Sequence, residues 1–548
     1  MQTKKRLDMV DWYSPTQLAQ TGIDTLVSTV LGASIDTRRL QVGEGGDDDC
    51  IIDYSGQKEL CFDYMADTGD GWDSTYSLAY LLMRPEIDVS GQRLKRADML
   101  IMGGDEVYPV ASQELYSQRL IEPFDQAAKD LRSEARISRL RNTDLFLIPG
   151  NHDWYDSLSS FSRRFFAYKH KDGSIQERTP FSQFKNRQMR SYFVLKLPSN
   201  WELWGLDIQL GKDVDNQQYT FFNDHAQSIT ANTKIIVCIA EPEYVYGEKK
   251  AGNLAFTLDR ITSLAYHKGA KVMVQLAGDV HNYQHYEIPK KTKQSQNYVR
   301  HHIVSGGGGA FLHPTHSFHS GDEKNPKTDP VQVYPEPQKS QELTNGLLWF
   351  ALKHKGMSAF IGGLYVAFLW QTGLQLESNN DSFWQTIMLF PVHHFGSFIL
   401  MLIVFVGSIA FAGFGSTKTI GLGAIHGLAH IIMAVICWFI GSSISELIVG
   451  IDSVVLGAYL SRIITFLIGG LLGGTLFGIY LWISLNILRH HHNEAFSALC
   501  CPDYKNFLRC KFTAEGALEI SVIGIEKSAS DDQQHPVKTH LIERITIF

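Results

Sequence analysis

The chain has 548 residues, a formal net charge of −7 and seven cysteines. That length is too great for one average domain and permits a sizeable buried core. The negative charge gives no indication of a nucleic-acid-binding surface, which is usually basic. Hydrophobic residues make up 44% and charged residues 20% of the chain, but unevenly. The first 340 or so residues are typical of a water-soluble protein, whereas the stretch from about 347 to 488 is strongly apolar.

The N-terminus, MQTKKRLDMVDWYSPTQLAQ, contains basic residues but neither an apolar core nor a small-residue cleavage site. We therefore expect no secretory signal and a cytoplasmic location for the domain that follows. No Cys-x-x-Cys pair occurs, which fits a reducing compartment. Cys500, Cys501, Cys510 and His490 to His492 carry metal-ligand side chains, but their spacing matches no standard zinc motif. Unbound thiols are the favoured interpretation.

Composition divides the chain into four parts. They are an N-terminal helical extension (1–56), an α/β domain (57–343), an apolar region (344–489) and a β-rich soluble segment (490–548).

The α/β domain repeats one pattern, an apolar strand followed by a turn rich in metal-ligand side chains. The segments are LCFDYMADTGDG (60–71), ADMLIMGGDEVYP (97–109), DLFLIPGNHD (144–153), KIIVCIAEPEY (234–244) and KVMVQLAGDVHNYQHY (271–286). Helical stretches lie between them, such as 114–141 and 255–268. Strands alternating with helices predict a layered α/β core. The strand at 201–210 alternates as well, so its tryptophans are predicted to be core residues.

Strand ends of such folds gather ligand sites. An Asp or Asn-His-Asp after one strand is usually only a turn or a helix cap. Here Asp, Asp, Asn and Asp/His follow successive strands in order, and that succession indicates a site. The candidates are Asp67, Asp105, Tyr108, Asn151, His152, Asp153, Glu241, Asp279, His281 and His285.

These motifs resemble the calcineurin-like metallophosphoesterase superfamily, in particular its purple-acid-phosphatase signature D-x-G, G-D-x-x-Y, G-N-H-D/E, V-x-x-H, G-H-x-H. The matching segments are 67–69, 104–108, 150–153 and 278–281. The resemblance covers roughly 57–315, and the whole chain is similar to bacterial multi-pass membrane metallophosphoesterases. It implies a layered β-sandwich flanked by helices, and phosphoester hydrolysis.

The resemblance also implies roles. Two metal ions would bind a phosphate and lower the pKa of a bridging water. Asp105 would bridge the ions, and Asp67, His281 and Tyr108 would complete the first. Asn151 would give the second ion a neutral oxygen.

The next two residues of that motif would act on the substrate or on each other. His152 would face the substrate, either donating a proton to the leaving oxygen or stabilising developing charge. Asp153 would either orient His152 or cap the following helix.

The chain departs from the family at two positions. Ala240 replaces the histidine of V-x-x-H and cannot bind a metal. Glu241 or Glu243 would take its place, or both would lie in solvent. Asp279 replaces the first histidine of G-H-x-H. An oxygen-rich site suits Mn, Mg or Fe(II) better than zinc, so we expect two divalent or trivalent ions, Mn or Fe before Zn.

The substrate is less well indicated. The run of four glycines at 306–309 is either a plain turn or a loop close to a ligand, with His313 or His316 lining the pocket. His285 is a second candidate for substrate contact. We expect a phosphorylated small molecule or a lipid-linked phosphate, membrane lipids as partners, and no nucleic acid.

The apolar region predicts spans near 357–373, 390–414, 420–441 and 463–488, each close to the roughly 20 residues that cross a bilayer. The segment 442–461 is a further span or an interfacial helix. Glycines in the fourth span would let helices approach closely. Lys or Arg occurs in every second connection between the spans. This pattern predicts that both ends of the region face the cytoplasm, and we expect the membrane to be a bacterial inner membrane.

Histidines also occur in this region. His426 and His430 share one helix face, and His393 and His394 begin span two. These histidines would bind a metal or a haem, form a proton path, or pack between helices. The packing role is the favoured interpretation.

The tail carries strands at 507–512, 517–525 and 541–548 and is expected to pack against the α/β domain. The chain is thus predicted to be a membrane-anchored dinuclear-metal phosphoesterase. Two alternatives stay open: a catalytically degenerate sensor or scaffold coupled to the helices, and a transporter that the α/β domain regulates.

Overall fold

The computed structural model describes ten segments of the chain, which fall into two compact units. The described residues are 6–27, 46–134, 142–209, 211–246, 252–288, 298–317, 329–369, 394–449, 454–530 and 537–548. The first unit comprises Met1–Val10, Gln20–Ser340 and Cys500–Phe548, and the second comprises Asp11–Ala19 and Gln341–Leu499. We describe each unit by itself.

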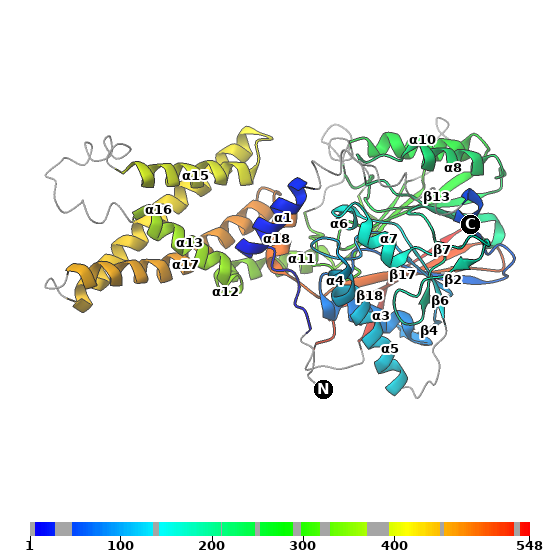
Figure 1. Ribbon diagram of the computed structural model, residues 1–548, viewed down its shortest axis with the longest axis horizontal. Helices are drawn as coiled ribbons and strands as arrows, with labels where there is room; N and C mark the ends of the chain where they lie inside the picture. Colours follow the sequence, from blue (N-terminus) through cyan, green and yellow to red (C-terminus); the bar gives the residue numbers. More distant parts are fainter. Residues whose placement is uncertain are drawn as a thin grey trace. The chain divides into compact units, whose positions relative to one another are not determined.

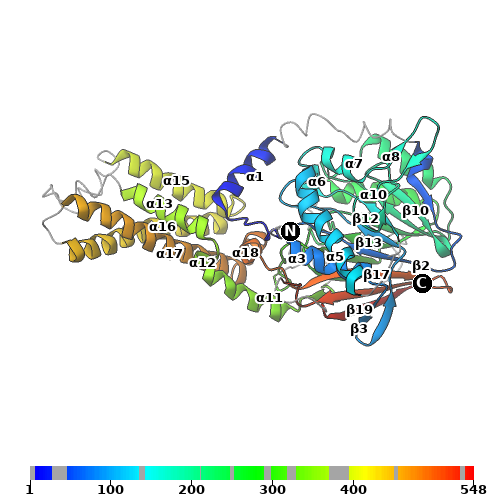
Figure 2. The same cartoon turned by 60° about the horizontal axis from the view of Figure 1, so that its bottom comes forward.

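The first unit contains two large β-sheets (Figures 1 and 2). The eight-stranded sheet has the order β1-β10-β11-β12-β13-β15-β14-β16 and the seven-stranded sheet the order β19-β18-β17-β2-β5-β6-β9. The strands of the first sheet are β1 (Ile51–Asp53), β10 (Phe193–Leu197), β11 (Trp201–Gly205), β12 (Lys234–Ile239), β13 (Lys271–Ala277), β14 (Tyr283–Glu287), β15 (His301–Ser305) and β16 (Gln332–Tyr334). Those of the second are β2 (Leu60–Met65), β5 (Met99–Met102), β6 (Thr143–Leu147), β9 (Phe184–Lys185), β17 (Lys505–Phe512), β18 (Leu518–Ile525) and β19 (Thr539–Ile547). Two small hairpins, β3 (Glu86–Val89) with β4 (Gln92–Lys95) and β7 (Tyr168–Lys169) with β8 (Ile175–Gln176), are separate.

Each sheet has a parallel centre covered by helices. Strands β2, β5 and β6 are mutually parallel, as are β11, β12, β13 and β15. The helices α3 (Trp72–Met83), α5 (Glu122–Glu134) and α7 (Ser159–Phe165) share an apolar core with the second sheet. The helices α8 (Asn216–Ala226) and α10 (Leu254–Tyr266) share one with the first. Strands buried on both faces are continuous apolar runs, which explains why the sequence pattern located them.

The two sheets pack face to face, as the predicted β-sandwich requires. The ring of Trp201 on β11 lies 5.9 Å from that of Phe512 on β17, and Phe146 on β6 lies 5.3 Å from Phe193 on β10. Trp201 and Trp204 are buried, which confirms the prediction that they are core residues.

The C-terminal tail is part of this sandwich. Its strand β17 pairs antiparallel with β2, with Leu508 opposite Tyr64 and Phe512 opposite Leu60. All three predicted tail strands are present as β17, β18 and β19. The packing expected from the sequence is thereby confirmed.

The N-terminal extension is only partly helical. Helix α1 spans Pro15–Val27, but β1 pairs in parallel with β10 as the edge strand of the first sheet. The predicted helical extension, residues 1–56, is therefore not helical at Ile51–Asp53, which form β1.

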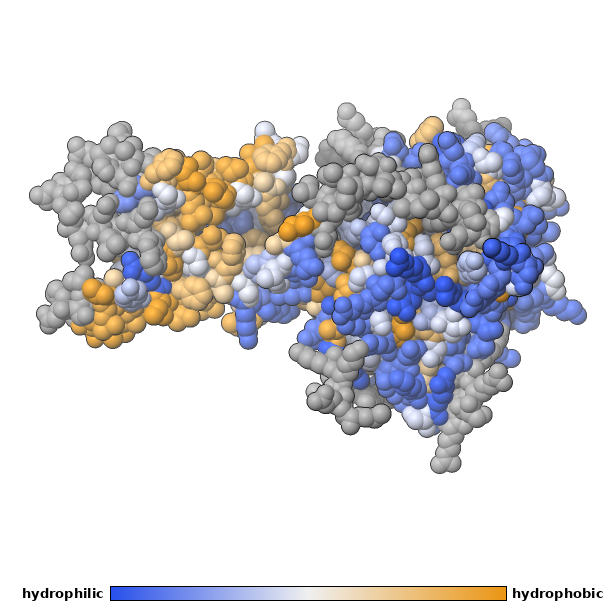
Figure 3. Space-filling view, viewed as in Figure 1, coloured by the Kyte–Doolittle hydropathy of each residue, from blue (hydrophilic) through white to orange (hydrophobic). Residues whose placement is uncertain are grey.

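The second unit is helical. Its main helices are α13 (Lys355–Leu369), α15 (Phe395–Ala412), α16 (Thr417–Val449) and α17 (Val454–Asn486), and shorter ones are η5 (Thr344–Trp349), α12 (Phe350–Lys353) and α18 (His492–Leu499). Among the described residues, three helices are long and apolar enough to cross a membrane: Phe395–Ala412, Thr417–Val449 and Val455–Asn486. Figure 3 shows apolar side chains over this surface. The first expected span, 357–373, corresponds to the 15-residue helix α13, and its last four residues, 370–373, lie outside the described residues.

Two further sequence expectations can be compared with these helices. Residues 442–461 hold no separate element in their described part, because α16 extends to Val449 and α17 begins at Val454. The glycines of α17 do serve close packing. A Cβ at Gly470 would lie 2.8 Å from the carbonyl oxygen of Ser358 on α13, so the two helices approach closely there.

Candidate metal centre

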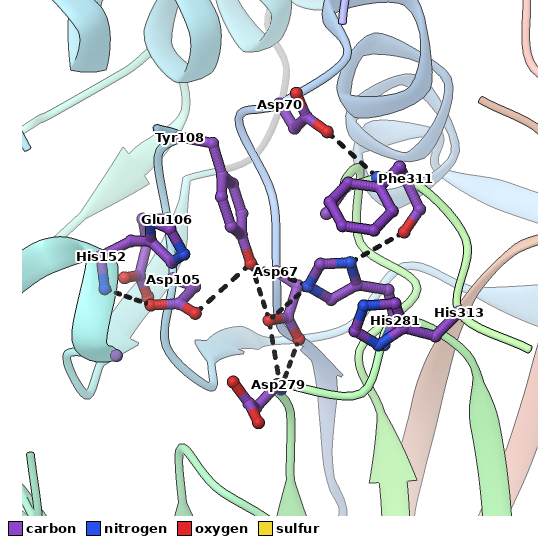
Figure 4. A network of polar contacts seen from close by, with 12 residues as sticks. Asp67, Asp70, Asp105, Glu106, Tyr108, His152, Asp279, His281, Phe311 and His313 are labelled. Carbon is purple, nitrogen blue, oxygen red and sulfur yellow. Dashed lines mark hydrogen bonds and ion pairs between the residues drawn. The ribbon is translucent and has the colours of Figure 1, made fainter. Parts of the chain in front are cut away.

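The centre forms where parallel strands end. Asp67 follows β2, Asp105 follows β5 and Asn151 begins α6 (Asn151–Trp154) after β6. Because β2, β5 and β6 are parallel neighbours, their carboxyl ends meet at one edge of the sheet. From the other sheet, Asp279 and His281 follow β13. Figure 4 shows Asp67, Asp105, Asp279 and His281 gathered around one point.

Three aspartates turn the chain immediately after their strands. Asp67, Asp105 and Asp279 have φ angles of 60°, 53° and 63°. This left-handed conformation is uncommon for residues other than glycine and clusters at functional sites, although Asp tolerates it better than most. The same local geometry on three strands directs three carboxylates into one buried region.

Two glycines allow the turns to pack tightly. A Cβ at Gly150 would lie 2.5 Å from the backbone nitrogen of Asp105. Gly104 has a φ of +109°, and a Cβ there would lie 2.8 Å from the Cβ of Ala240. Gly104 and Gly150 are therefore required by close backbone approach at this edge.

The phenol of Tyr108 lies at the middle of the group. Its hydroxyl is 3.0 Å from Asp67 Oδ1, 3.3 Å from Asp105 Oδ2 and 3.0 Å from His281 Nε2 (Figure 4). Tyr108 is buried. Three predicted ligands from three strand ends thus converge on one hydroxyl oxygen.

His281 is held in a defined orientation. Its Nδ1 lies 2.8 Å from the carbonyl oxygen of Phe311 and donates to it, which leaves a lone pair on Nε2 facing Tyr108. The ring of His313 stacks on that of His281 at 4.0 Å, and its Nδ1 accepts from the His281 N–H at 3.2 Å. His313 therefore supports His281, and its contact with a substrate remains a prediction.

The acidic groups are buried together. Burial raises the pKa of Asp67, Asp105 and Asp279 well above the ordinary range. Neighbouring carboxylates raise it further: Asp105 and Asp279 act on Asp67, Asp153 on Asp105, and Glu241 on Asp279. Several acids that repel one another away from water need a cation to be ionised.

The donor set fits metal ions that prefer oxygen. Counting only His, Cys, Asp and Glu, no three side chains among the described residues form a group that could hold an ion as they stand. The convergence here depends on Tyr108, a donor outside those four types. Carboxylates, a phenol and one imidazole suit Mn or Fe. These residues therefore fit the metal centre that the family resemblance implies.

His152 borders the centre. Its backbone N–H donates to Asp105 Oδ1 at 2.8 Å, and its ring lies 4.3 Å from that of Tyr108. Its Nδ1 lies 2.6 Å from the carbonyl oxygen of Pro109 and donates to it, so Nε2 is the ring nitrogen that can exchange a proton. Burial lowers the pKa of His152.

Asp153 behaves as a helix cap. Its Oδ2 accepts from the N–H of Gly150 at 2.8 Å and of Glu106 at 3.3 Å, and its Oδ1 accepts from the Tyr116 hydroxyl at 2.5 Å. Of the two sequence interpretations, these contacts favour capping, because the Nδ1 of His152 bonds to Pro109.

Two other candidates have different partners. Glu241 Oε2 accepts from Lys212 Nζ at 2.6 Å, so as it stands it pairs with a lysine. His285 lies on β14, with Nδ1 3.0 Å from Glu543 Oε1 and Nε2 3.1 Å from His301 Nδ1. Both ring nitrogens of His285 have partners there, and its contact with a substrate remains a prediction.

The tail supplies residues that sequence reasoning missed. A Cβ at Gly306 would lie 2.6 Å from Asp67 Oδ2, so the glycine run lies against this ligand. The Asn506 N–H donates to Gly307 O at 3.1 Å, and Lys505 Nζ donates to Ala310 O at 2.6 Å. Lys505 is fully buried, and burial lowers its pKa to about 8. No local motif around residue 505 indicates this role.

The comparison with protein families agrees with this architecture. Residues 62–283 match the family model of calcineurin-like phosphoesterases, so this part of the chain is a calcineurin-like phosphoesterase domain. No curated protein matches the chain significantly.

Two solved structures resemble parts of the chain. A purple acid phosphatase, PPD1 from yellow lupin (Lupinus luteus) seeds, is 16% identical over 47% of this chain and 46% of its own, with a TM-score of 0.29. PhoD is 12% identical over 46% of this chain and 58% of its own, also with a TM-score of 0.29. The chain thus spans about half the length of these structures.

Proposed function

We propose that this protein is a membrane-anchored phosphoesterase that uses a two-metal centre to hydrolyse a phosphomonoester, phosphodiester or pyrophosphate. The observation that carries the proposal is the convergence of Asp67, Asp105 and His281 on the Tyr108 hydroxyl within 3.3 Å. Buried acids at adjacent strand ends, in a calcineurin-like phosphoesterase domain, are otherwise costly to retain.

The residues divide between two ions. Asp67, Tyr108 and His281 would hold the first, Asp105 would bridge, and Asn151 and Asp279 would serve the second. Two such ions bind phosphate oxygens and lower the pKa of water. Mn or Fe is favoured by the oxygen-rich donors, and Zn remains possible.

The chain's own groups would orient and protonate the substrate. The bond from His152 Nδ1 to Pro109 fixes the ring, and in the imidazolium form the second proton, on Nε2, would pass to the leaving oxygen. Asp153 holds the start of α6 through Gly150 and thereby the placement of Asn151 and His152.

The substrate class follows from the anchor. In the part of the chain that the structure describes, three helices have the length and composition of membrane spans. We infer a bacterial inner-membrane protein with a cytoplasmic α/β domain and C-terminus. Its substrate would be a phosphorylated small molecule or a lipid-linked phosphate, with membrane lipids as partners.

The alternative is a catalytically degenerate domain that senses or scaffolds through the helices. Its support is the alanine at position 240 and the pairing of Glu241 with Lys212 at 2.6 Å. With both groups lost as ligands, the second ion would be bound weakly, and the domain would respond to metal without turning over.

The test measures hydrolysis of 4-nitrophenyl phosphate and bis(4-nitrophenyl) phosphate by the purified full-length protein, with bound metal counted. The full chain is needed because β17 completes the sheet beside β2. Asp105→Asn should abolish activity, whereas Asp88→Asn on the β3 hairpin should retain it. About two Mn or Fe per chain with this difference would support the enzyme. Equal rates in wild type and Asp105→Asn would favour the sensor.

A further inference from the structure

The helical unit contains a buried group of ring side chains from three helices. Tyr365 on α13, His426 and His430 on α16, and Tyr480 on α17 are 1%, 5%, 6% and 6% exposed. The rings of His426 and Tyr480 are stacked, with centres 3.8 Å apart and planes 8° apart. These polar rings lie among helices that are otherwise mostly apolar.

The glycines of α17 make room for Tyr365. A Cβ at Gly469 would lie 2.8 Å from the Tyr365 ring, and one at Gly473 would lie 2.9 Å from its hydroxyl. With its ring seated there, the Tyr365 hydroxyl lies 2.7 Å from Nδ1 of His430. The glycines of α17 therefore allow the contact between Tyr365 and His430 as well as close helix packing.

The hydrogen bonds of this group have one best direction. Nε2 of His430 lies 3.0 Å from Nε2 of His426, and each neutral imidazole carries a single N–H. If Tyr365 donates to His430, then His430 donates to His426, and His426 retains its own hydrogen on Nδ1. The reverse direction leaves both the Tyr365 hydrogen and the His426 lone pair unsatisfied. The first direction satisfies more groups, so the Nδ1–H of His426 is a donor.

Two donors in this group have no partner within the described residues. They are Nδ1 of His426 and the hydroxyl of Tyr480. Because the two rings are stacked with their centres 3.8 Å apart, the two atoms belong to directly adjoining rings. A buried donor without an acceptor destabilises the fold, because it has lost its hydrogen bonds to water. The two donors, His426 Nδ1–H and the Tyr480 hydroxyl, lie close enough for one small molecule to contact both. They therefore indicate a ligand that accepts hydrogen bonds.

The surroundings restrict the chemistry of that ligand. In the described part of the chain, no Lys or Arg forms a hydrogen bond or ion pair with His426, His430 or Tyr480. An anion there would lack a counter-charge in an apolar bundle, which is costly. A neutral acceptor such as a carbonyl oxygen avoids that cost. The ring of Phe477, whose centre is 5.5 Å from that of His426, adds an apolar side chain beside the two donors.

We propose that His426 and Tyr480 form a binding site for a neutral, membrane-soluble carbonyl compound of the quinone class, with both side chains donating to its oxygens. His430 and Tyr365 fix the tautomer of His426 and so make its Nδ1 a donor. The site is independent of the phosphoesterase centre and adds a ligand to the helical unit.

The test titrates decylubiquinone into the full-length protein in lipid nanodiscs and follows tryptophan fluorescence. We expect saturable binding by the wild type. Tyr480→Phe keeps the ring and removes only the hydroxyl, so binding should weaken about tenfold, the effect of one lost hydrogen bond. His426→Gln should weaken it to a similar extent. The control is Tyr459→Phe, because Tyr459 lies on the same helix and is exposed.

The outcomes separate this site from the proposed enzyme. Hydrolysis of aryl phosphate should be the same in all these variants. No saturable binding by the wild type would mean that water or another part of the chain satisfies the two donors, and the proposal would fall. Equal affinity of wild type and Tyr480→Phe would overturn it as well. Because Tyr480→Phe preserves the helix packing, it decides the question even if His426→Gln folds poorly.

Discussion

The contact that joins the C-terminal tail to the sandwich gives the sharpest prediction. Arg509 on β17 donates to both carboxylate oxygens of Asp63 on β2, through Nε and Nη2, at 2.8 Å each. Both side chains are 3% exposed. Arg509→Met would leave Asp63 buried without its partner. Breaking a buried pair on one side costs about 3–5 kcal/mol, and local opening of β2 should become easier by that amount.

The assay is native-state hydrogen exchange of the amides of β2 and β17 in the full-length protein. A cost of 3–5 kcal/mol corresponds to about two to four powers of ten in protection. Lys511→Met is the matched control, because Lys511 lies on the same strand, 3.5 Å from Glu59, and both side chains are exposed. An exposed pair of this kind contributes about 0–1 kcal/mol.

The defect should also depend on pH. Burial raises the pKa of Asp63 even beside Arg509, and without the arginine it rises further. The native state then holds a proton that the unfolded chain releases. Stability of Arg509→Met is therefore greatest below the unfolded pKa of about 4 and falls as the pH rises through the folded pKa. If protection in Arg509→Met equals that in Lys511→Met at pH 7, the tail does not hold β2 in this way.

Three further predictions concern the centre. Tyr108→Phe removes the hydroxyl between Asp67, Asp105 and His281 and should lower bound metal per chain, measured by elemental analysis, with an unchanged circular dichroism spectrum; unchanged metal would exclude Tyr108 as a ligand. Gly150→Ala places a methyl group against Asp105 and should abolish aryl phosphatase activity and lower the melting temperature by several degrees; wild-type activity would show that the turn can relax. Lys212→Met frees Glu241 from its 2.6 Å ion pair and should raise metal affinity several-fold, measured by chelator competition; no change would mean that Glu241 does not reach the ion.

The strands and the ligand turns were predictable because their causes are local. Asp67 and Asp105 follow parallel strands buried on both faces, and such strands are visible as short apolar runs. Parallel pairing then brings their carboxyl ends together. The partners of His285, which lies on β14, could not be predicted in this way. Its partner Glu543 lies 258 positions away, and no local period reveals a contact of that range.

The alternatives for Asp153 and Glu241 were undecidable for a related reason. Capping by Asp153 depends on where the N–H groups of Gly150 and Glu106 point, which is a matter of turn geometry. The pairing of Glu241 with Lys212 depends on the loop that follows β11. Residue type and spacing identify which groups can bind an ion, but a competing partner from another segment decides which of them do.

The family match ends at residue 283, yet the support of Asp67 extends to residue 506. The glycine run at 306–309 lies against Asp67 and is held by Lys505 and Asn506. Between these parts, the sequence inserts the larger segment of the helical unit, Gln341–Leu499. Strand β2 therefore keeps an unpaired edge during synthesis until residues 505–512 have been made, and unpaired edges invite wrong pairings. Burial of Arg509 against Asp63 favours the correct partner strand, since any other register would leave the buried Asp63 carboxylate without its two bonds to the Arg509 guanidinium. The ion pair thus selects β17 as the strand that completes the sheet beside β2. The support of Asp67 by Lys505 and Asn506 forms only when that strand is in place.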